Sequence, residues 1–372
     1  MKIAIRVDSS RIIGSGHLMR CLTLAKKLRE RNAEVIFVSR LHPGNMVPFT
    51  EREGFRVRSL PGVNCIDDLE ASGNDNDQEN SLGVGWEEDA AQTLVKLGEI
   101  APVDWLVVDH YSLDARWERA IRQVAKRIMV IDDLADRSHD CDILLDQNYH
   151  DETRDRYAGL VPAGSQMFLG PRYSLLRSEF IRVRTPPRFR DGHVRRMLVF
   201  FGGSDACNET AKTIAAIKSL DRHDIEVDVI VGKGNINKET IEELCSTDSR
   251  FHYHCQVDDM ARRIQDADLA IGAGGTSTWE RCYLGVPSVT VVVAENQAAT
   301  TAAVSRFGAT INLGDSKTVT VSDIRRTLEG LLSDPAALMD MGGKARALMG
   351  DGIHDGADEI ARVLLGNGNA AV

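Results

Sequence analysis

Near its start the chain contains the stretch Ile3-Ala-Ile-Arg-Val-Asp-Ser-Ser-Arg-Ile-Ile-Gly-Ser-Gly-His-Leu-Met-Arg20, which decides the fold. The apolar run 3–7 predicts a buried strand, and a glycine-bearing loop follows it. Apolar positions then recur with helical spacing, at Leu22, Leu24, Ala25 and Leu28. A strand, a glycine loop and a helix in this order present backbone N–H groups and the positive end of a helix dipole. Such a place binds anions or polar ligands.

A histidine is the most informative residue of this loop. Gly14-Ser-Gly16 leads directly into His17, and histidine is the side chain best suited to proton transfer near neutral pH. The glycines do not complete the dinucleotide fingerprint G-x-G-x-x-G, because Met19 occupies its last position. We therefore expect a ligand at the bare backbone of Gly14 and Gly16, with His17 as a catalytic base. A helix-capping histidine that orients the loop is the alternative.

Length and composition limit the class of protein. The 372 residues are too many for one ordinary domain and suit two. A net charge of −10 argues against nucleic acid and anionic membranes as partners, but not against a small anionic substrate. No apolar run approaches the roughly 18 residues of a membrane span, so no membrane insertion is expected. The seven scattered cysteines lack C-x-x-C spacing, which predicts reduced thiols and a cytoplasmic location.

The chain alternates between apolar runs and helical segments, which predicts an α/β fold with parallel sheets. The predicted strands are 3–7, 35–39, 105–108, 128–131 and 143–145, then 197–201, 225–231, 251–253, 269–271 and 289–293. Pro186-Pro187 interrupts the series. We expect an N-terminal domain over 1–185, a linker over 186–196 and a C-terminal domain over 197–372. Two Rossmann-like domains of this kind would face a cleft with the carboxyl ends of their sheets.

Glycine-rich turns after strands recur in the second half. Phe201-Gly-Gly203-Ser-Asp205 opens it, and Ile271-Gly-Ala-Gly274-Gly275-Thr276 is the densest. Bare backbone at a helix start suits a diphosphate, with Thr276 or Ser277 as the N-cap and Glu280 as an acceptor for ribose hydroxyls. The alternative is a tight turn with Glu280 in solvent. The amides of Asn296 and Gln297 suit sugar hydroxyls or acetamido groups, although Asn296 could equally cap a helix.

Three other features have weaker functional interpretations. His252-x-His254-Cys255 could bind zinc, but no cluster completes a tetrahedral site, so we expect no metal and no cofactor. Asp132-Asp133 ends a strand and could line the cleft, or act as a pair of glycosidase carboxylates. The polar segment 71–85 predicts a surface loop, either disordered or acting as a lid.

Six segments together resemble the UDP-2,4-diacetamido-2,4,6-trideoxy-β-L-altropyranose hydrolases of pseudaminic acid biosynthesis, called the PseG family, which are related to SpsG-type spore-coat polysaccharide proteins. The resemblance covers roughly residues 1–310. The segments are Arg6-x-Asp-Ser-Ser-x-x-x-Gly-x-Gly-His17-x-x-Arg20, Cys141-Asp-Ile-Leu-Leu-Asp-Gln-Asn148, Gly170-Pro-x-Tyr173-x-Leu-Leu-Arg177-x-Glu-Phe180, Phe201-Gly-Gly-Ser-Asp205, Gly274-Gly275-x-x-x-Trp-Glu280 and Asn296-Gln297. The segment 71–85 and the C-terminal tail are longer than compact members of the family need.

The resemblance implies a GT-B fold similar to that of the MurG glycosyltransferase, and metal-free hydrolysis of a UDP-sugar at the anomeric C–O bond with inversion. His17 would be the general base for the attacking water. Glu280 would lie at the uridine–ribose end of the substrate. The other positions carried over as substrate-binding are Asp8, Gly14, Gly16, Arg20, Tyr111, Arg177, Gly203, Gly274, Gly275, Thr276, Asn296 and Gln297. No oligomer is implied.

Two rival functions remain open at this stage. A GT-B glycosyltransferase using a UDP-amino sugar would share the nucleotide pocket and pass the sugar to an acceptor. At a membrane it would normally show an apolar or basic docking patch, and only Met46-Val-Pro-Phe49 hints at one. A non-catalytic nucleotide-sugar binding protein is the second rival, and it would not need His17.

Overall fold

The computed structural model describes residues 1–10, 13–62, 81–151, 155–184, 188–350 and 352–366. Their packing divides the chain into two compact units. The first unit comprises Met1–Asn148, Glu152–Leu175 and Asp355–Val372, and the second comprises Tyr149–Asp151 and Leu176–His354. Most of the segment 71–85, in which a lid was considered, lies outside the described residues.

The first unit is built on a parallel sheet with the strand order β3-β2-β1-β4-β5-β6-β7. Ile5 of the central strand pairs with Phe37 on one side and Val107 on the other. The strands are β1 (Lys2–Val7), β2 (Glu34–Arg40), β3 (Arg56–Leu60), β4 (Val103–Asp109), β5 (Ala125–Ile131), β6 (Ile143–Asp146) and β7 (Gln166–Leu169). The helices are α1 (Gly16–Glu30), α2 (Val47–Arg52), α3 (Trp86–Gly98), α4 (Ala115–Ile121), the short η1 (Pro171–Tyr173) and α13 (Gly356–Leu364).

Apolar side chains cover both faces of this sheet, because the central strands are buried on both sides. One core contains Ile3, Ile5 and Trp105 together with residues of α1 and α13. The other contains Leu106, Val108 and Trp117, and includes residues of α3 and α4. The sheet with helices on both faces is a Rossmann-like layer arrangement.

The second unit repeats this design with a parallel sheet in the order β10-β9-β8-β11-β12-β13. The strands are β8 (Arg196–Phe200), β9 (Glu226–Val231), β10 (Phe251–Cys255), β11 (Leu269–Ala273), β12 (Ser288–Val292) and β13 (Ile311–Asp315). The helices are α5 (Ser178–Val183), α6 (Glu209–Lys218), α7 (Lys238–Ser246), α8 (Met260–Asp266), α9 (Ser277–Tyr283), the short η2 (Glu295–Gln297), α10 (Ala298–Phe307), α11 (Val321–Leu332) and α12 (Pro335–Leu348). The expected α/β class with two parallel sheets is confirmed.

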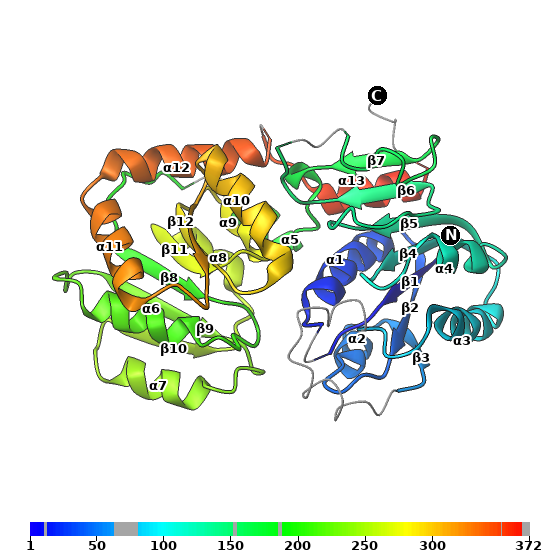
Figure 1. Cartoon of the computed structure of the whole chain (residues 1–372), viewed down its shortest axis with the longest axis horizontal. Helices are drawn as coiled ribbons and strands as arrows, with labels where there is room; N and C mark the ends of the chain where they lie inside the picture. The colour runs from blue at the N-terminus through cyan, green and yellow to red at the C-terminus, as the bar shows by residue number, and fades with distance from the viewer. Residues whose placement is uncertain (11–12, 63–80, 152–154, 185–187, 351, 367–372) are drawn as a thin grey trace. The chain divides into compact units, whose positions relative to one another are not determined.

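The last helix does not follow the domain bounds expected from the sequence. We expected all of 197–372 in one domain, but α13 packs against α1 in the first unit, and Figure 1 shows it in red beside the first unit's strands. Its buried face contains Ile360 and Leu364, and Trp105 Nε1 donates a hydrogen bond of 2.7 Å to the Leu364 carbonyl. The amphipathic face of α13 thus completes the core of the first unit.

The segment between the two halves also packs differently from a free linker. Phe180 of α5 is buried in a core of the second unit, and the main segment of that unit starts at Leu176. Within the expected linker, Arg188 Nη2 lies 2.6 Å from Asp268 Oδ1, and Arg190 Nε donates to the Ala267 carbonyl at 2.9 Å. These contacts attach residues 188–190 to the amino end of β11.

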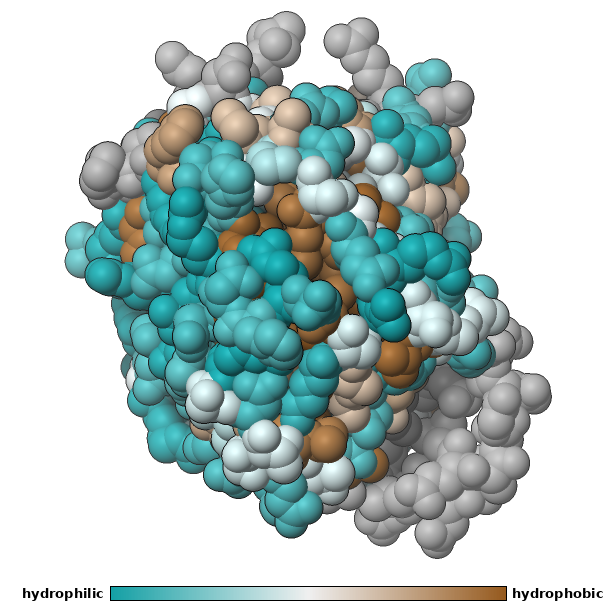
Figure 2. Space-filling view, turned by 90° about the vertical axis from the view of Figure 1, so that its left-hand side faces the viewer, coloured by the Kyte–Doolittle hydropathy of each residue, from teal (hydrophilic) through white to brown (hydrophobic). Residues whose placement is uncertain are grey.

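The face of the protein drawn in Figure 2 is largely polar. Figure 2 shows a face on which hydrophilic side chains predominate and apolar ones occur in scattered places between them. None of the helices in the described part of the chain is long and apolar enough to cross a lipid bilayer.

Candidate functional site

Aspartates stand at the carboxyl ends of four neighbouring strands in the first unit. They are Asp8 after β1, Asp109 at the end of β4, Asp132 after β5 and Asp146 at the end of β6. Because parallel strands end at the same edge of a sheet, this edge collects the acids. Each of the four forms an ion pair with an arginine, namely Arg6, Arg20, Arg137 and Arg156 in the same order.

His17 lies in the first turn of α1 and points its Nδ1 at the end of β4. His17 Nδ1 is 2.6 Å from Asp109 Oδ1, and the histidine side chain is 12% exposed. Tyr111 packs edge-on against the imidazole, with ring centroids 4.6 Å apart. Arg20 Nη2 lies 3.1 Å from the same Nδ1. The carboxylate, at the shorter distance, favours the tautomer that carries its hydrogen on Nδ1, which leaves Nε2 to accept a proton.

Arg20 and Asp133 complete this group, which we call the His17 cluster (His17, Arg20, Asp109, Tyr111 and Asp133). Arg20 donates to both oxygens of Asp109 at 2.7 Å, and its Nη1 lies 3.1 Å from Asp133 Oδ2. The Tyr111 hydroxyl donates to Asp133 Oδ1 at 2.7 Å. The sequence predicted His17, Arg20 and Tyr111 at the site, and the structure brings these three together.

The electrostatics of the His17 cluster keep Asp109 ionised. Burial alone raises the pKa of this carboxyl, but the charge of Arg20, followed by the attraction and hydrogen bond of His17, outweighs burial and holds the pKa well below its usual range. For Arg20 the same two effects have the opposite signs. Burial lowers the pKa of the guanidinium, but the charge of Asp109 more than compensates, so this pKa lies well above its ordinary value. Asp109 is therefore a permanent negative charge behind the imidazole.

Asp8, predicted to bind substrate, is instead the centre of a buried network. It is 1% exposed, and Arg6 donates to both of its oxygens, at 2.5 and 2.9 Å. The backbone N–H of Arg40 donates to it at 2.7 Å, and His110 Nε2 lies 3.3 Å away. Asp89 ties Arg6 and Arg40 together from α3, with contacts of 2.7 and 2.6 Å. Asp8 thus anchors the start of the loop that leads to His17.

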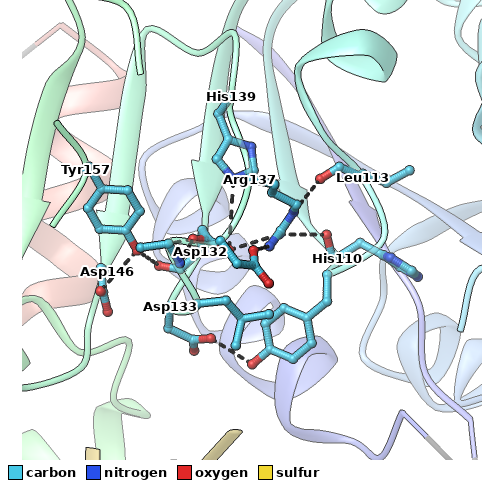
Figure 3. A network of polar contacts seen from close by, with 12 residues as sticks. His110, Leu113, Asp132, Asp133, Arg137, His139, Asp146 and Tyr157 are labelled. Carbon is cyan, nitrogen blue, oxygen red and sulfur yellow. Dashed lines mark hydrogen bonds and ion pairs between the residues drawn. The ribbon is translucent and has the colours of Figure 1, made fainter. Parts of the chain in front are cut away.

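Asp132 and Asp133 have separate roles. Asp132 is fully buried, and Figure 3 shows Arg137 and Tyr157 converging on it. The Tyr157 hydroxyl lies 3.2 Å from Asp132 Oδ2 and 3.1 Å from Asp146 Oδ2, while Arg137 is 2.9 Å from Asp132 Oδ1. Asp133 contacts Arg20 and Tyr111 of the His17 cluster, whereas Asp132 contacts Arg137 and Tyr157. The two acids therefore do not form a pair at one reacting centre.

In the second unit, glycine turns follow β8 and β11. A Cβ placed on Gly274 would lie 2.1 Å from Thr301 Oγ1, so glycine is needed for the close approach of α10. Gln297 also borders this turn, and its Oε1 accepts a hydrogen bond from the Val293 N–H at 3.3 Å. The turn after β8 meets another glycine turn, because a Cβ on Gly232 would lie 2.3 Å from the Gly203 carbonyl oxygen.

Glu280 lies one turn into α9 and forms an ion pair. Its Oε1 is 3.2 Å from Arg177 Nη2, and its side chain is 17% exposed. Arg177 also contacts Glu179 at 2.8 Å, from the N-cap position of α5. Thr276 occupies the N-cap position of α9 as predicted, but its side chain makes no capping hydrogen bond. Asn296 lies in η2 beside Gln297.

The two predicted glycines of the first loop, Gly14 and Gly16, shape the backbone before His17. Gly14 has a φ of +77°, and its N–H donates to the Ser10 carbonyl at 3.0 Å, which closes the loop before α1. Gly16 is the first residue of α1, directly before His17. The two histidines considered as zinc ligands instead contact carboxylates, His252 with Glu226 and His254 with Asp228. No group of three or more His, Cys, Asp or Glu side chains in the described ranges could hold a metal ion.

Comparisons with known proteins agree with this architecture. Residues 197–359 match the model of the glycosyltransferase family 28 C-terminal domain. The chain is 28% identical over 304 residues to the uncharacterized protein MJ1062 of Methanocaldococcus jannaschii, covering 80% of this chain but only 57% of that protein. It is 21% identical over 309 residues to the UDP-2,4-diacetamido-2,4,6-trideoxy-beta-L-altropyranose hydrolase of Campylobacter jejuni, covering 83% of this chain and 97% of the hydrolase.

The solved structures give the same fold at low identity. The crystal structure of MurG from Acinetobacter baumannii superposes with a TM-score of 0.62 at 16% identity, over 98% of this chain and 100% of that one. The two α/β units thus have the fold of the GT-B glycosyltransferases. Within this chain, residues 197–359 match the glycosyltransferase family 28 C-terminal domain.

Proposed function

We propose that the protein hydrolyses a UDP-linked 2,4-diacetamido-2,4,6-trideoxyhexose (UDP-6-deoxy-AltdiNAc) to UDP and the free sugar, with C–O cleavage and inversion at C1, as a step of pseudaminic acid biosynthesis. The observation that carries this proposal is the contact of 2.6 Å between His17 Nδ1 and Asp109 Oδ1. The name of the Campylobacter jejuni relative, which matches over 97% of its length, supports the choice of substrate.

The dyad of His17 and Asp109 can perform the proton transfer. Asp109 accepts a hydrogen bond from the Nδ1–H of His17. This leaves Nε2 free to take a proton from water as the water oxygen bonds to C1. The electron pair of the C1–O bond leaves with the UDP oxygen, and inversion follows from attack opposite the leaving group. UDP is a good leaving group, so the base is the main chemical contribution of the protein, worth about 10²–10⁴ in rate.

We propose that the first unit supplies the catalytic base and that the second unit binds the nucleotide. In the His17 cluster Arg20 is already matched by Asp109 and Asp133, so it is not available to hold a phosphate. The second unit presents glycine turns at Gly203 and Gly274–Gly275, whose bare backbone suits a diphosphate. We propose that Glu280 accepts hydrogen bonds from the ribose, and that Arg177, Asn296 and Gln297 lie near the substrate.

Glycosyl transfer from a UDP-amino sugar is the second candidate function. The family 28 match of residues 197–359 favours it, since that family is named for glycosyl transfer. The chemistry would differ only in the nucleophile: His17 would deprotonate an acceptor hydroxyl instead of water.

One experiment separates these functions. The purified protein is incubated with the UDP-sugar in H₂¹⁸O without any acceptor, and UDP and labelled sugar are followed by mass spectrometry. Stoichiometric UDP and ¹⁸O-labelled sugar support hydrolysis, provided that His17→Asn slows the release of both by about 10²-fold or more. UDP release that requires an added acceptor would assign a transferase, and binding without turnover would assign a nucleotide-sugar binding protein. A panel of altro, gluco and manno sugars identifies the configuration that is used.

A further inference from the structure

Arg281 of α9 is a buried arginine whose side chain reaches the carboxyl end of β11, and no local sequence pattern indicates it. It is 2% exposed and extends from α9 back to the end of the strand. Its Nη2 donates to the Ala273 carbonyl at 2.9 Å and to Thr278 Oγ1 at 3.1 Å, and its Nη1 donates to Ser277 Oγ at 3.1 Å. The guanidinium thus holds both ends of the turn that contains Gly274 and Gly275.

The charge of Arg281 has no carboxylate partner among the described residues. Its hydrogen-bond acceptors are one carbonyl and two hydroxyls, and its Nε has none. Burial lowers the pKa of the guanidinium, and the weaker attraction of Cys282 and Glu280 does not offset this. In contrast, the buried Arg20 pairs with two aspartates. Burying an unpaired charge is costly, which is a reason to look for an anion that compensates it.

The surroundings of the turn point to the same ligand. A Cβ on Gly272 would lie 3.0 Å from Arg281 Nη1 and 2.3 Å from the Phe200 carbonyl oxygen, so glycine leaves room for the guanidinium beside the strand. Thr301 is 2% exposed, and its Oγ1 has no hydrogen-bond partner in the described structure. This hydroxyl faces the backbone of Gly274, where an added Cβ would approach it to 2.1 Å. A buried cation and an unpartnered buried hydroxyl therefore border one glycine turn.

We propose that Arg281 supplies the positive charge with which the turn 274–277 binds the diphosphate of the nucleotide. It is a positioning residue that acts through the turn. Because Arg281 occupies the Ser277 and Thr278 oxygens as acceptors, the hydroxyl hydrogens of these residues remain as donors, and the one at Ser277 can reach an anion. The inference rests on the proposed function, in which the second unit holds UDP.

The test compares nucleotides that differ only in phosphate. Calorimetry measures the affinities of UDP and uridine for the wild type, Arg281→Gln and Arg281→Lys. Gln keeps a polar amide but removes the charge, so UDP affinity should fall by about ten-fold or more while uridine affinity changes less than about two-fold. Lys should restore UDP affinity to within about three-fold of the wild type.

Arg190→Gln is the matched control. Arg190 also donates to backbone carbonyls, those of Ala267, Gln265 and Leu284, but its Ala267 contact lies at the amino end of β11, away from the glycine turn. Its substitution should leave the ratio of UDP to uridine affinity unchanged. Equal losses for UDP and uridine in Arg281→Gln would show a purely structural role and overturn the inference, as would no loss.

The failure of the proposed function has a different signature. A wild type that binds UDP but releases no labelled sugar without an acceptor would refute hydrolysis and leave the Arg281 comparison valid, whereas a wild type that binds no UDP would refute nucleotide binding itself. Should Arg281→Gln fail to fold, Ser277→Ala provides a second test, because it removes the hydroxyl that Arg281 orients. UDP affinity should then fall by about three-fold or more with uridine affinity unchanged. UDP affinity equal to that of the wild type in this variant would contradict the inference.

Discussion

Arg20 holds Asp109 by two hydrogen bonds of 2.7 Å, from Nε to Oδ2 and from Nη2 to Oδ1. This bidentate geometry fixes the plane of the carboxylate, and the same Oδ1 lies 2.6 Å from His17 Nδ1. The direction of the imidazole is thus determined by an arginine one turn further along α1.

The first prediction concerns Asp109. Asp109→Asn replaces an acceptor by a group that can present its N–H₂ to Nδ1, which favours the wrong tautomer of His17. We expect kcat to fall by about 10²-fold or more. UDP affinity should stay within about two-fold, because the glycine turns belong to the second unit. Steady-state kinetics and calorimetry measure the two quantities.

Asp104→Asn is the control for this variant, since Asp104 lies on the same strand β4 and pairs with Lys126 away from His17. It should retain wild-type kcat. A normal kcat in Asp109→Asn would exclude the dyad from the mechanism.

The second prediction is a pH dependence of stability. The pKa of Asp109 is lowered in the folded protein, so its ion pair contributes stability above the unfolded-state pKa of about 3.9, and the contribution is lost as the pH falls toward the folded-state pKa. The difference in free energy of unfolding between wild type and Asp109→Asn should therefore be constant between about pH 7 and 5 and shrink below about pH 4. Urea titrations across this range measure it. A difference that grows on acidification would contradict the assignment.

The interior strands of both sheets could be predicted from sequence, whereas three of the four edge strands could not. Buried parallel strands such as β1 and β4 appear as continuous apolar runs, and their positions were predicted to within a few residues. The strands that were not predicted, β3, β7 and β13, are all edge strands. An edge strand is partly exposed and mixes polar with apolar residues, as Arg56–Leu60 does, so it lacks the apolar signal.

In the candidate site, residues within one loop could be predicted from sequence, but contacts between residues far apart in the chain could not. The loop sequence predicted His17, but its partner Asp109 is 92 positions away and is brought close by the pairing of β1 with β4. Asp8 illustrates the same limit, because nothing in the sequence beside it indicates its buried contacts with the Arg6 side chain and the Arg40 N–H. Likewise nothing local indicated that α13 returns to the first unit.

The third prediction concerns the nucleotide. Glu280→Ala should weaken UDP binding by about 1–3 kcal/mol if its carboxylate accepts hydrogen bonds from the ribose. Because Glu280 also pairs with Arg177 at 3.2 Å, Arg177→Gln is the necessary control: it removes the ion pair and keeps the carboxylate. Calorimetry with UDP and 2′-deoxy-UDP identifies the contact. Loss of discrimination between these two ligands in Glu280→Ala supports it, and unchanged UDP affinity would place Glu280 outside the site.

The last prediction concerns His17 and decides the mechanism. His17→Asn and His17→Leu should lower kcat by about 10²-fold or more while UDP-sugar binding stays nearly intact, because the proton moves only in the transition state. Water that attacks C1 opposite UDP must invert the anomeric centre, so NMR before mutarotation should detect only the opposite anomer. In H₂¹⁸O the label should enter the sugar and not UDP. Label on UDP would mean that water attacks phosphorus, and a base at His17 would then act on a different bond from the one proposed.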